Sequence, residues 1–526
     1  MPEQWGDAIV EATYAGHPGL VHQPRPRSLI GLLDDSARFG ERDFLVHGDE
    51  RITFDVFRRA ARPAAEVLAA HGVRPGDRVL LFAYNSPAWV LGFWGAWVAG
   101  AIPVLGNRWW SDDELTSALD IATPAAVITD RPELAERGLR VIAVDALAAC
   151  FDGPPADPDL AGAAWPDEDS EAMVLFTSGS SGRAKGVRLS HRSLLANQHN
   201  LLLGARRLPH QQNLDDPPTV TLVTVPLFHI GGVTHLITQV IAGGRLVLLD
   251  GRFDPGRVID LIEQERVTSW GGVPTMARRV LEHPRFDEAD LSSLRSFPLG
   301  GAPVPESLLD KVRTKVPGLA RGLATTWGLS ESGGFLTLAR ARDLLERPGT
   351  SGRPYPVVEL RVDDPDDTGA GELLVRSPTV MLGYLGLPDD RTVDADGWLR
   401  TGDVGRFADG FVYITGRSKD IVIRGGENVA CPHVEDVLLR HPDVLEAAVM
   451  GIPHEDLGEE LVATVVVRDG RGPTVAALRE HAAAHLAYFE VPTRWLVRTE
   501  ALPVLPSGKM DKVQLRAAQV AAAKEA

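Results

Sequence analysis

The sequence predicts an α/β protein with a large N-terminal domain, and three patterns along the chain support this class. Through the first half, short apolar runs typical of buried strands alternate with segments of helical periodicity. Residues 357–415 change to short β-type runs separated by Asp-Gly turns. After residue 420 a compact alternation of strands and helices resumes. We therefore expect two parallel-type α/β sheets and a small antiparallel barrel or sheet, followed by a small α+β domain.

The individual elements follow from run length and periodicity, because strands are short and bounded by turn residues whereas helices carry apolar residues at helical spacing. In the first half we expect strands at 78–82, 125–129, 219–225 and 245–249, and helices at 56–71 and 257–266. In the C-terminal part we expect strands at 421–423, 447–450 and 461–467, and helices at 433–440 and 515–526, the last of them solvated or frayed. Stretches rich in Pro, Asp and Gly at 152–169 and 208–218 are typical of surface loops.

The uncharged segment 88–107 has the length and hydrophobicity of a membrane span. Gly100 and Pro103 divide it, however, into a short tryptophan-rich helix and a strand at 102–105. Each half is too short to cross a bilayer. We expect a buried helix followed by a buried strand, and no membrane span.

Bulk composition is that of a folded protein with more than one domain. The chain has 526 residues, of which 44% are hydrophobic and 24% charged. Its 54 Lys and Arg face 71 Asp and Glu, a formal net charge of -17 that disfavours nucleic acid as a partner. Cys150 and Cys431 are the only cysteines, and they lack the spacing of a zinc site or disulfide framework. The N-terminus shows no secretory signal, so we expect a cytoplasmic protein.

Residues 176–186 carry the strongest local signal of function. The segment holds three glycines, four hydroxyl side chains and two cations directly after an apolar run. Glycines allow backbone N–H groups to converge on an anion, and the cations add charge, so a nucleotide phosphate is the expected ligand. The alternative is a flexible surface connection. A Walker-type loop is disfavoured because Lys185 lies between Ala184 and Gly186. The residues expected to bind phosphate are Thr177, Ser178, Gly179, Ser180, Ser181, Gly182 and Lys185.

Further motifs follow in a fixed order: PLGGAP at 298–303, TTWGLSES at 325–332, GWLRTGD at 397–403, GRSKDIVIRGGEN at 416–428 and LPSGKMDK at 505–512. With the loop at 176–186, they resemble the adenylate-forming superfamily of acyl-CoA synthetases, stand-alone adenylation domains and luciferases. The resemblance covers nearly the whole chain. It implies an AMP-binding domain at 1–417, a hinge at 418–420 and a small mobile domain at 421–526.

The resemblance also implies the chemistry. ATP and a carboxylic acid would give an acyl-adenylate and pyrophosphate, and the thiol of coenzyme A would then displace AMP. Lys509 would be the catalytic cation, although a lysine in a Pro-Ser-Gly turn is usually a solvated side chain. Glu331 would coordinate Mg²⁺, and Asp403 would bind the ribose. The remaining nucleotide-binding residues would be Gly301, Ala302, Pro303, Thr326, Trp327, Gly328, Ser330 and Arg417.

In the superfamily the small domain rotates between the two half-reactions, here about Lys419. Gly425 and Gly426 would line the channel for coenzyme A, where a narrow tunnel leaves no space for a Cβ atom.

The segment Phe228-His229-Ile230 stands where the amino-acid-activating branch carries a carboxylate. The absence of that carboxylate here predicts a substrate with an uncharged acyl chain or ring, that is, a hydrophobic fatty, aryl or terpenoid acid. His229 would lie at the pocket entrance with a catalytic role, and a buried structural histidine is the alternative. The expected acyl-pocket residues are His229, Gly232, Val233, Leu299 and Gly333.

Three positions depart from the pattern of the superfamily. Ala184 replaces a usual proline, Ser330 a threonine and Trp327 a tyrosine. Ala184 bears on adenylation, because proline would restrict the phosphate loop. Three hypotheses therefore stand: a complete acyl-CoA ligase; a ligase specialised for one half-reaction or for a carrier-protein thiol; and a catalytically silent nucleotide-binding protein. A small-molecule carboxylic acid is the expected partner, and a homodimer is left open.

Overall fold

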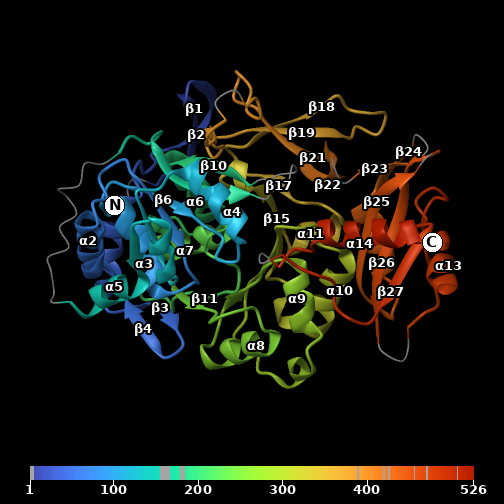
Figure 1. Ribbon diagram of the computed structural model, residues 1–526, viewed down its shortest axis with the longest axis horizontal. Helices are drawn as coiled ribbons and strands as arrows, with labels where there is room; N and C mark the ends of the chain where they lie inside the picture. The colour runs from blue at the N-terminus through green and yellow to red at the C-terminus, as the bar shows by residue number, and fades with distance from the viewer. Residues whose placement is uncertain are drawn as a thin grey trace.

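The fold is described from a computed structural model. It describes residues 5–153, 166–177, 184–387, 390–418, 421–424, 427–454, 456–468, 472–505 and 508–525. Elements from the start of the chain, such as α2 and α3, occupy one end of the long axis, and β25, β26, β27 and α13 occupy the other (Figure 1). The middle of the chain therefore lies between the two ends.

The first sheet has seven strands and carries the residues that flank the phosphate loop. Its order is β20 (Gly383–Tyr384), β10 (Lys185–Ser190), β9 (Glu171–Thr177), β6 (Ile102–Leu105), β5 (Arg78–Phe82), β7 (Ala126–Thr129) and β8 (Val141–Ala143). Strands β9 to β8 are parallel, whereas β10 and β20 join antiparallel. The associated helices are α2 (Phe54–Ala70), α3 (Pro87–Val98), α4 (Asp112–Ala122) and α5 (Val144–Ala148).

The second sheet has five strands, in the order β13 (Ser269–Trp270), β11 (Val220–Val223), β12 (Arg245–Leu248), β3 (Asp43–His47) and β4 (Glu50–Thr53). All are parallel except β4, which forms a hairpin with β3. The helices of this region are α6 (His191–Ala205), α7 (Ile230–Ala242), α8 (Pro255–Gln264) and α9 (Pro274–Leu281). The predicted pair of α/β sheets is confirmed.

Two four-stranded sheets follow. The first contains β14 (Phe297–Leu299), β15 (Leu323–Leu329), β16 (Gly334–Arg340) and β17 (Arg353–Pro354), with α10 (Glu306–Lys315) and α11 (Ala341–Glu346) beside it. The second contains β18 (Glu359–Asp363), β19 (Gly371–Arg376), β21 (Leu399–Ala408) and β22 (Phe411–Arg417), all antiparallel. Of the predicted barrel or sheet, the structure has the sheet: β18 and β22 are its edges in the described residues. Four strands are too few to close around a filled interior.

The C-terminal sheet has the order β24 (Glu427–Ala430), β23 (Ile421–Arg424), β26 (Gly458–Val467) and β25 (Val444–His454), and β27 (Arg494–Arg498) pairs with β26. Its helices are α12 (Cys431–Leu439), α13 (Val475–His485) and α14 (Lys512–Glu525). The prediction of a solvated terminal helix is wrong for α14 as far as Gln519. Leu515 is buried there, and Gln519 donates to Thr464 Oγ1 over 2.9 Å, because α14 packs on this sheet.

The tryptophan-rich segment is a buried helix and strand, as predicted. Ser86 caps α3 by accepting from the Trp89 N–H, and Pro87 occupies the first turn. The next strand, β6, is parallel to β5 and β9. Across the parts of the chain that the structure describes, no helix combines the length and hydrophobicity needed to cross a membrane.

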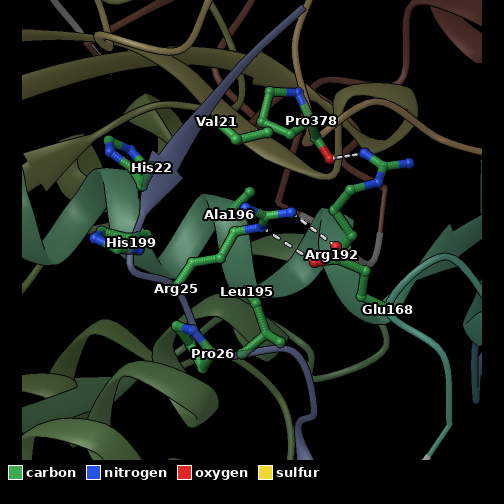
Figure 2. Close-up of a pocket in the computed structure, with 10 residues that line it drawn as sticks. All are labelled: Val21, His22, Arg25, Pro26, Glu168, Arg192, Leu195, Ala196, His199 and Pro378. Carbon is green, nitrogen blue, oxygen red and sulfur yellow. Dashed lines mark hydrogen bonds and ion pairs between the residues drawn. The ribbon is translucent and has the colours of Figure 1, made fainter. Parts of the chain in front are cut away.

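The N-terminal hairpin of β1 (Ala8–Tyr14) and β2 (His17–Gln23) packs on α6, where Figure 2 shows a small pocket. The rings of His22 and His199 stack with centroids 4.1 Å apart. Beside them Arg25 makes two hydrogen bonds to Glu168, and the buried Arg192 donates to the Pro378 carbonyl (Figure 2). The histidine stack joins the hairpin to α6, and Arg25 joins the residues after β2 to the segment before β9. The remaining short helix, α1 (Ile30–Asp35), follows the hairpin.

Candidate active site

The two ends of the predicted phosphate loop are held by a β-hairpin. Thr177 is the last residue of β9 and pairs with Lys185, the first residue of β10. The loop between them thus connects two antiparallel strands. Of the residues predicted to bind phosphate, Ser178, Gly179, Ser180, Ser181 and Gly182 lie outside the described residues.

Lys185 lies beside a tyrosine and an aspartate. Its Nζ is 4.3 Å from the centroid of the Tyr384 ring and 3.5 Å from Asp390 Oδ2. Removal from water tends to raise the pKa of Asp390, but hydrogen bonds from Thr392 and the charge of Lys185 outweigh it and lower that pKa. The lysine is therefore paired with a carboxylate in this structure.

Glu331 lies in the short 3₁₀ helix η8 (Ser330–Ser332) between β15 and β16. The buried Ser332 hydroxyl fixes this turn by accepting from the Leu329 N–H over 3.1 Å and donating to the Gly334 carbonyl over 2.8 Å. The backbone carbonyl of Glu331 accepts from the Met381 N–H over 2.9 Å. The side-chain Oε1 of Glu331 accepts from the Tyr384 hydroxyl over 2.8 Å. Burial and the Glu331 charge raise the pKa of Tyr384, which keeps the hydroxyl protonated as a donor.

Asp403 is the centre of a second cluster. It is buried on β21 and pairs across the sheet with Arg417 of β22, whose Nε donates to Oδ1 over 2.9 Å. Trp327 of β15 donates its indole N–H to Oδ2 over 2.7 Å. Both carboxylate oxygens are thus oriented by neighbours. The flanking residues Thr326 and Gly328 lie on β15, opposite β16.

The segment Gly301-Ala302-Pro303 follows β14 and lies close to the C-terminal part of the chain. Gly301 has φ +75°, a conformation that side chains with a Cβ rarely adopt. A Cβ at this position would lie 3.7 Å from Lys509 Cε. The segment 301–303, which the resemblance predicts to flank adenine, and the predicted catalytic lysine are therefore neighbours.

Lys509 lies in a turn in which the Leu505 N–H donates to the Lys509 carbonyl over 2.7 Å. The turn packs against α9: a Cβ on Gly508 would lie 2.6 Å from Met276 Cε. The Lys509 side chain reaches solvent but has protein on most sides. Removal from water and the charge of Arg417 lower the pKa of Lys509, while Asp403 and Glu331 oppose the shift. The charge of Lys509 thus interacts with the carboxylates of both Asp403 and Glu331.

His229 precedes α7, and its Nε2 is buried without a hydrogen-bond partner among the described residues. Burial and then the charge of Lys509 lower the pKa of His229 to about 3, so the imidazole is neutral. Its ring lies 4.5 Å from that of Phe228, centroid to centroid. A neutral ring with an unused polar atom therefore lies near the lysine.

The other predicted acyl-pocket residues are packed closely. Val233 and Leu299 are buried in two hydrophobic clusters. A Cβ on Gly232 would lie 2.6 Å from the Pro226 carbonyl oxygen, and one on Gly333 would lie 2.3 Å from that of Thr379. Both glycines therefore permit close backbone packing. Their role as pocket lining stays a prediction.

Some predicted positions lie outside the described residues: the hinge residue Lys419 and the channel residues Gly425 and Gly426. Other residues of the site were missed. Tyr384 and Asp390 sit in no recognisable local motif, and their partners are about 50 to 200 positions away in sequence. Within the described residues, no three His, Cys, Asp or Glu come together as a metal site.

Comparisons with known proteins show the family to which the chain belongs. The AMP-binding enzyme family matches residues 33–385, and the AMP-binding enzyme C-terminal domain matches residues 433–509. A feruloyl-CoA synthase of Amycolatopsis sp is 36% identical over 485 residues, which are 89% of this chain and 94% of that protein. A 3-[(3aS,4S,7aS)-7a-methyl-1,5-dioxo-octahydro-1H-inden-4-yl]propanoyl:CoA ligase of Rhodococcus jostii (strain RHA1) is 34% identical, covering 94% of this chain and 99% of that one.

Among solved structures, the o-succinylbenzoate coenzyme A synthetase of Bacillus subtilis in complex with ATP and magnesium ion has a TM-score of 0.76 and 28% sequence identity. The match covers 92% of this chain and 98% of that chain. The fold is that of the adenylate-forming enzymes. The chain belongs to the AMP-binding enzyme family and, within it, to the acyl-CoA ligases.

Proposed function

We propose that this chain is an ATP-dependent acyl-CoA ligase that activates a hydrophobic carboxylic acid of the fatty, aryl or terpenoid class. The observation that carries the proposal is the buried Asp403, oriented by Trp327 and Arg417, together with Lys509 beside the segment that begins at Gly301. In the first half-reaction the substrate carboxylate attacks the α-phosphate of ATP, which gives an acyl-adenylate and pyrophosphate. In the second, the thiol of coenzyme A attacks the acyl carbon and releases AMP.

Lys509 stabilises the first transition state by placing a cation where negative charge accumulates between the carboxylate and the α-phosphate. Asp403 accepts hydrogen bonds from the ribose hydroxyls, and Trp327 and Arg417 hold it in place. Lys185 contributes a cation to the phosphates from the end of its loop. Ser330 donates to the α-phosphate from the turn that also bears Glu331.

Glu331 fits a magnesium ion, because Mg²⁺ is usually bound by one or two carboxylates together with substrate phosphates. The metal would supply charge neutralisation at those phosphates. The hydrogen bond from Tyr384 orients the Glu331 carboxylate for this purpose. The remaining nucleotide contacts are assigned to Thr177 and to the adenine segment Gly301-Ala302-Pro303, which lies beside Lys509.

The class of acid is inferred from the residue type at position 229. In Phe228-His229-Ile230 an imidazole stands where the amino-acid-activating branch has a carboxylate, so nothing there pairs with a substrate ammonium. The relatives named for feruloyl-CoA and for a fused-ring propanoyl-CoA product support an uncharged ring or chain. His229 Nε2 is the polar atom available to the acid near Lys509.

The second half-reaction is assigned to the C-terminal unit. We place the domains at 1–417 and 421–526 with a hinge at 418–420, and Gly425 and Gly426 at the coenzyme A channel. The match of the C-terminal family domain to residues 433–509 supports a separate unit that carries Lys509.

The test is thioester formation, followed by mass spectrometry over a panel of fatty, aryl and polycyclic acids. One series receives ATP, Mg²⁺ and free acid, and a parallel series receives preformed acyl-adenylate; both contain coenzyme A. Product in both series is the expected result. Product from the adenylates alone would favour a ligase specialised for the second half-reaction, for which Ala184 in the phosphate loop is the specific reason. No product and no pyrophosphate with any acid would contradict the proposal.

A further inference from the structure

The short strand β20 joins two parts of the site that are far apart in sequence. It pairs antiparallel with β10, with Tyr384 opposite Val187. The Leu385 N–H donates to the Gly186 carbonyl over 2.7 Å, next to Lys185. Just before β20, the Met381 N–H donates to the Glu331 carbonyl. The backbone around β20 is therefore bonded both to the strand that begins at Lys185 and to the turn that carries Glu331.

The Tyr384 side chain repeats this connection. Its hydroxyl donates to Glu331 Oε1 over 2.8 Å, and its ring faces Lys185 Nζ at 4.3 Å from the centroid. The side chain is only 8% exposed, so its ring has little freedom to turn away. A phenol can serve a carboxylate at its hydroxyl and a cation at its ring face at the same time. Tyr384 thus contacts the proposed metal-binding carboxylate and the proposed phosphate-binding cation.

We propose that Tyr384 is a positioning residue that holds Glu331 for Mg²⁺ and Lys185 for the nucleotide phosphates at a fixed separation. The inference rests on the proposed function of the site. The hydroxyl donates to Oε1, so the second oxygen of Glu331 would be the one that holds the metal. The ring keeps the ammonium of Lys185 on the same side as the carboxylate. Because the two contacts use different parts of one side chain, substitution can separate them.

The experiment measures binding, not turnover. The full-length protein is titrated with MgCl₂ at a fixed concentration of α,β-methylene-ATP, which cannot be cleaved at the reacting bond, and binding is followed by tryptophan fluorescence and calorimetry. Tyr384→Phe removes the hydroxyl and keeps the ring. We expect the Mg²⁺ concentration for half-maximal binding to rise about tenfold, as is usual when a group that orients a metal ligand is lost.

A second variant tests the ring. Tyr384→Leu should show the same shift in Mg²⁺ dependence and, in addition, about threefold weaker binding of the triphosphate at saturating Mg²⁺, because the contact with Lys185 is also lost. Binding of AMP without Mg²⁺ should stay unchanged in both variants. The matched control is Tyr413→Phe, since the Tyr413 ring lies against Arg406. It should behave as the wild type in every titration.

A double-variant cycle completes the test. In a Glu331→Gln background, Tyr384→Phe should have no further effect on Mg²⁺ dependence, because its partner carboxylate is gone. The inference is overturned if Tyr384→Phe titrates with Mg²⁺ as the wild type does. It is also overturned if AMP binding falls as much as triphosphate binding, since that indicates general damage to the fold. A wild-type protein that shows no Mg²⁺-dependent binding of the triphosphate would instead refute the proposed function itself.

Discussion

At the scale of single residues, the site depends on carboxylates whose oxygens accept hydrogen bonds from neighbouring side chains. Asp403 is buried, yet each of its oxygens accepts a hydrogen bond, one from Arg417 and one from Trp327. Where the superfamily usually has tyrosine, the indole N–H of Trp327 is used to orient this carboxylate. A buried carboxylate that loses a donor is left partly unpaired, which costs about 1–3 kcal/mol.

Trp327→Phe should therefore weaken AMP binding about tenfold, because the ring remains but the donor to Asp403 is lost. Calorimetric titration with AMP measures the effect. The same titration with 2′,3′-dideoxy-AMP should show a much smaller difference between variant and wild type, since that ligand cannot use Asp403. Trp398→Phe, at a tryptophan whose ring faces Arg361, is the control. Equal losses for both ligands would refute the assignment of Asp403 to the ribose.

Lys509→Ala should abolish pyrophosphate formation but largely spare transfer from a supplied acyl-adenylate to coenzyme A. The reason is that the cation acts where charge develops at the α-phosphate, a step that the supplied adenylate bypasses. Pyrophosphate release and thioester formation are measured separately on the same preparation. Lys512→Ala, at a lysine paired with Glu435, is the control. If both half-reactions of Lys509→Ala fell together, the assigned role would be wrong.

At the scale of elements, the N-terminal hairpin is fixed to α6 by two histidines that are buried in neutral form. His199 Nε2 lies 2.6 Å from the Gly6 carbonyl oxygen, and His22 Nε2 lies 2.8 Å from Asn200 Oδ1. Burial and then the neighbouring His22 lower the pKa of His199 to about 3, with Arg25 and His210 acting in the same direction. Burial and Arg25 lower the pKa of His22, and Asn200 opposes this.

This stack makes the hairpin acid-sensitive. Because the pKa of His199 lies below its value of 6.5 in the unfolded chain, the unfolded state binds more protons as the pH falls. The contribution of neutral His199 to the free energy of unfolding is complete above pH 6.5 and is lost progressively toward pH 3. His199→Gln should remove this part of the pH dependence, which is at most about 2 kcal/mol between pH 6.5 and 5.0.

Urea denaturation at pH 7.5 and pH 5.0 provides the measurement. The midpoint of the wild type should fall more between the two pH values than that of His199→Gln. His433→Gln, at an exposed histidine of α12, should keep the full difference. If the midpoint of His199→Gln fell as much between the two pH values as that of the wild type, His199 would not be the source of the acid sensitivity.

At the scale of the whole molecule, α9 ties the C-terminal unit to the large domain. Arg278 donates to the Leu445 carbonyl, and Arg279 contacts both Glu446 and the Leu502 carbonyl, each at 3.3 Å. Glu446 in turn accepts from the Leu502 N–H over 2.6 Å, a few residues before Lys509. This interface therefore supports the position of Lys509 near Glu331 and Asp403.

Arg279→Ala should slow adenylate formation up to about fivefold, since its ion pair with Glu446 still reaches solvent and contributes about 1 kcal/mol. Transfer from a supplied acyl-adenylate should be unaffected or faster, because it does not use Lys509. Single-turnover measurement of each half-reaction checks this. Arg342→Ala, at an exposed pair with Glu346 on α11, is the control. Equal slowing of both half-reactions would argue against a role of this interface in placing Lys509.

Much of the architecture could be predicted because its causes are local. The strand expected at 78–82 is β5, and those expected at 125–129 and 245–249 are β7 and β12 within one residue at each end. Gly100, with φ +71°, separates the helix from the strand as predicted, since backbone geometry acts at the residue itself, whereas Pro103 lies within β6. The prediction of a solvated helix at 515–526 is wrong as far as Gln519 because the burial of Leu515 on α14 depends on a sheet formed elsewhere in the chain.

The motifs and their order were sufficient to determine the family of this protein, and the residue types in them determined which side chains could carry its chemistry. Only the tertiary structure decided how those side chains are oriented: that Trp327 holds Asp403, that Tyr384 stands between Lys185 and Glu331, and that α9 supports the turn of Lys509. The physical reason is the separation along the chain of the residues that interact. Periodicity, caps and glycine conformation are set by neighbours along the chain, whereas these contacts form only when strands distant in sequence are packed side by side.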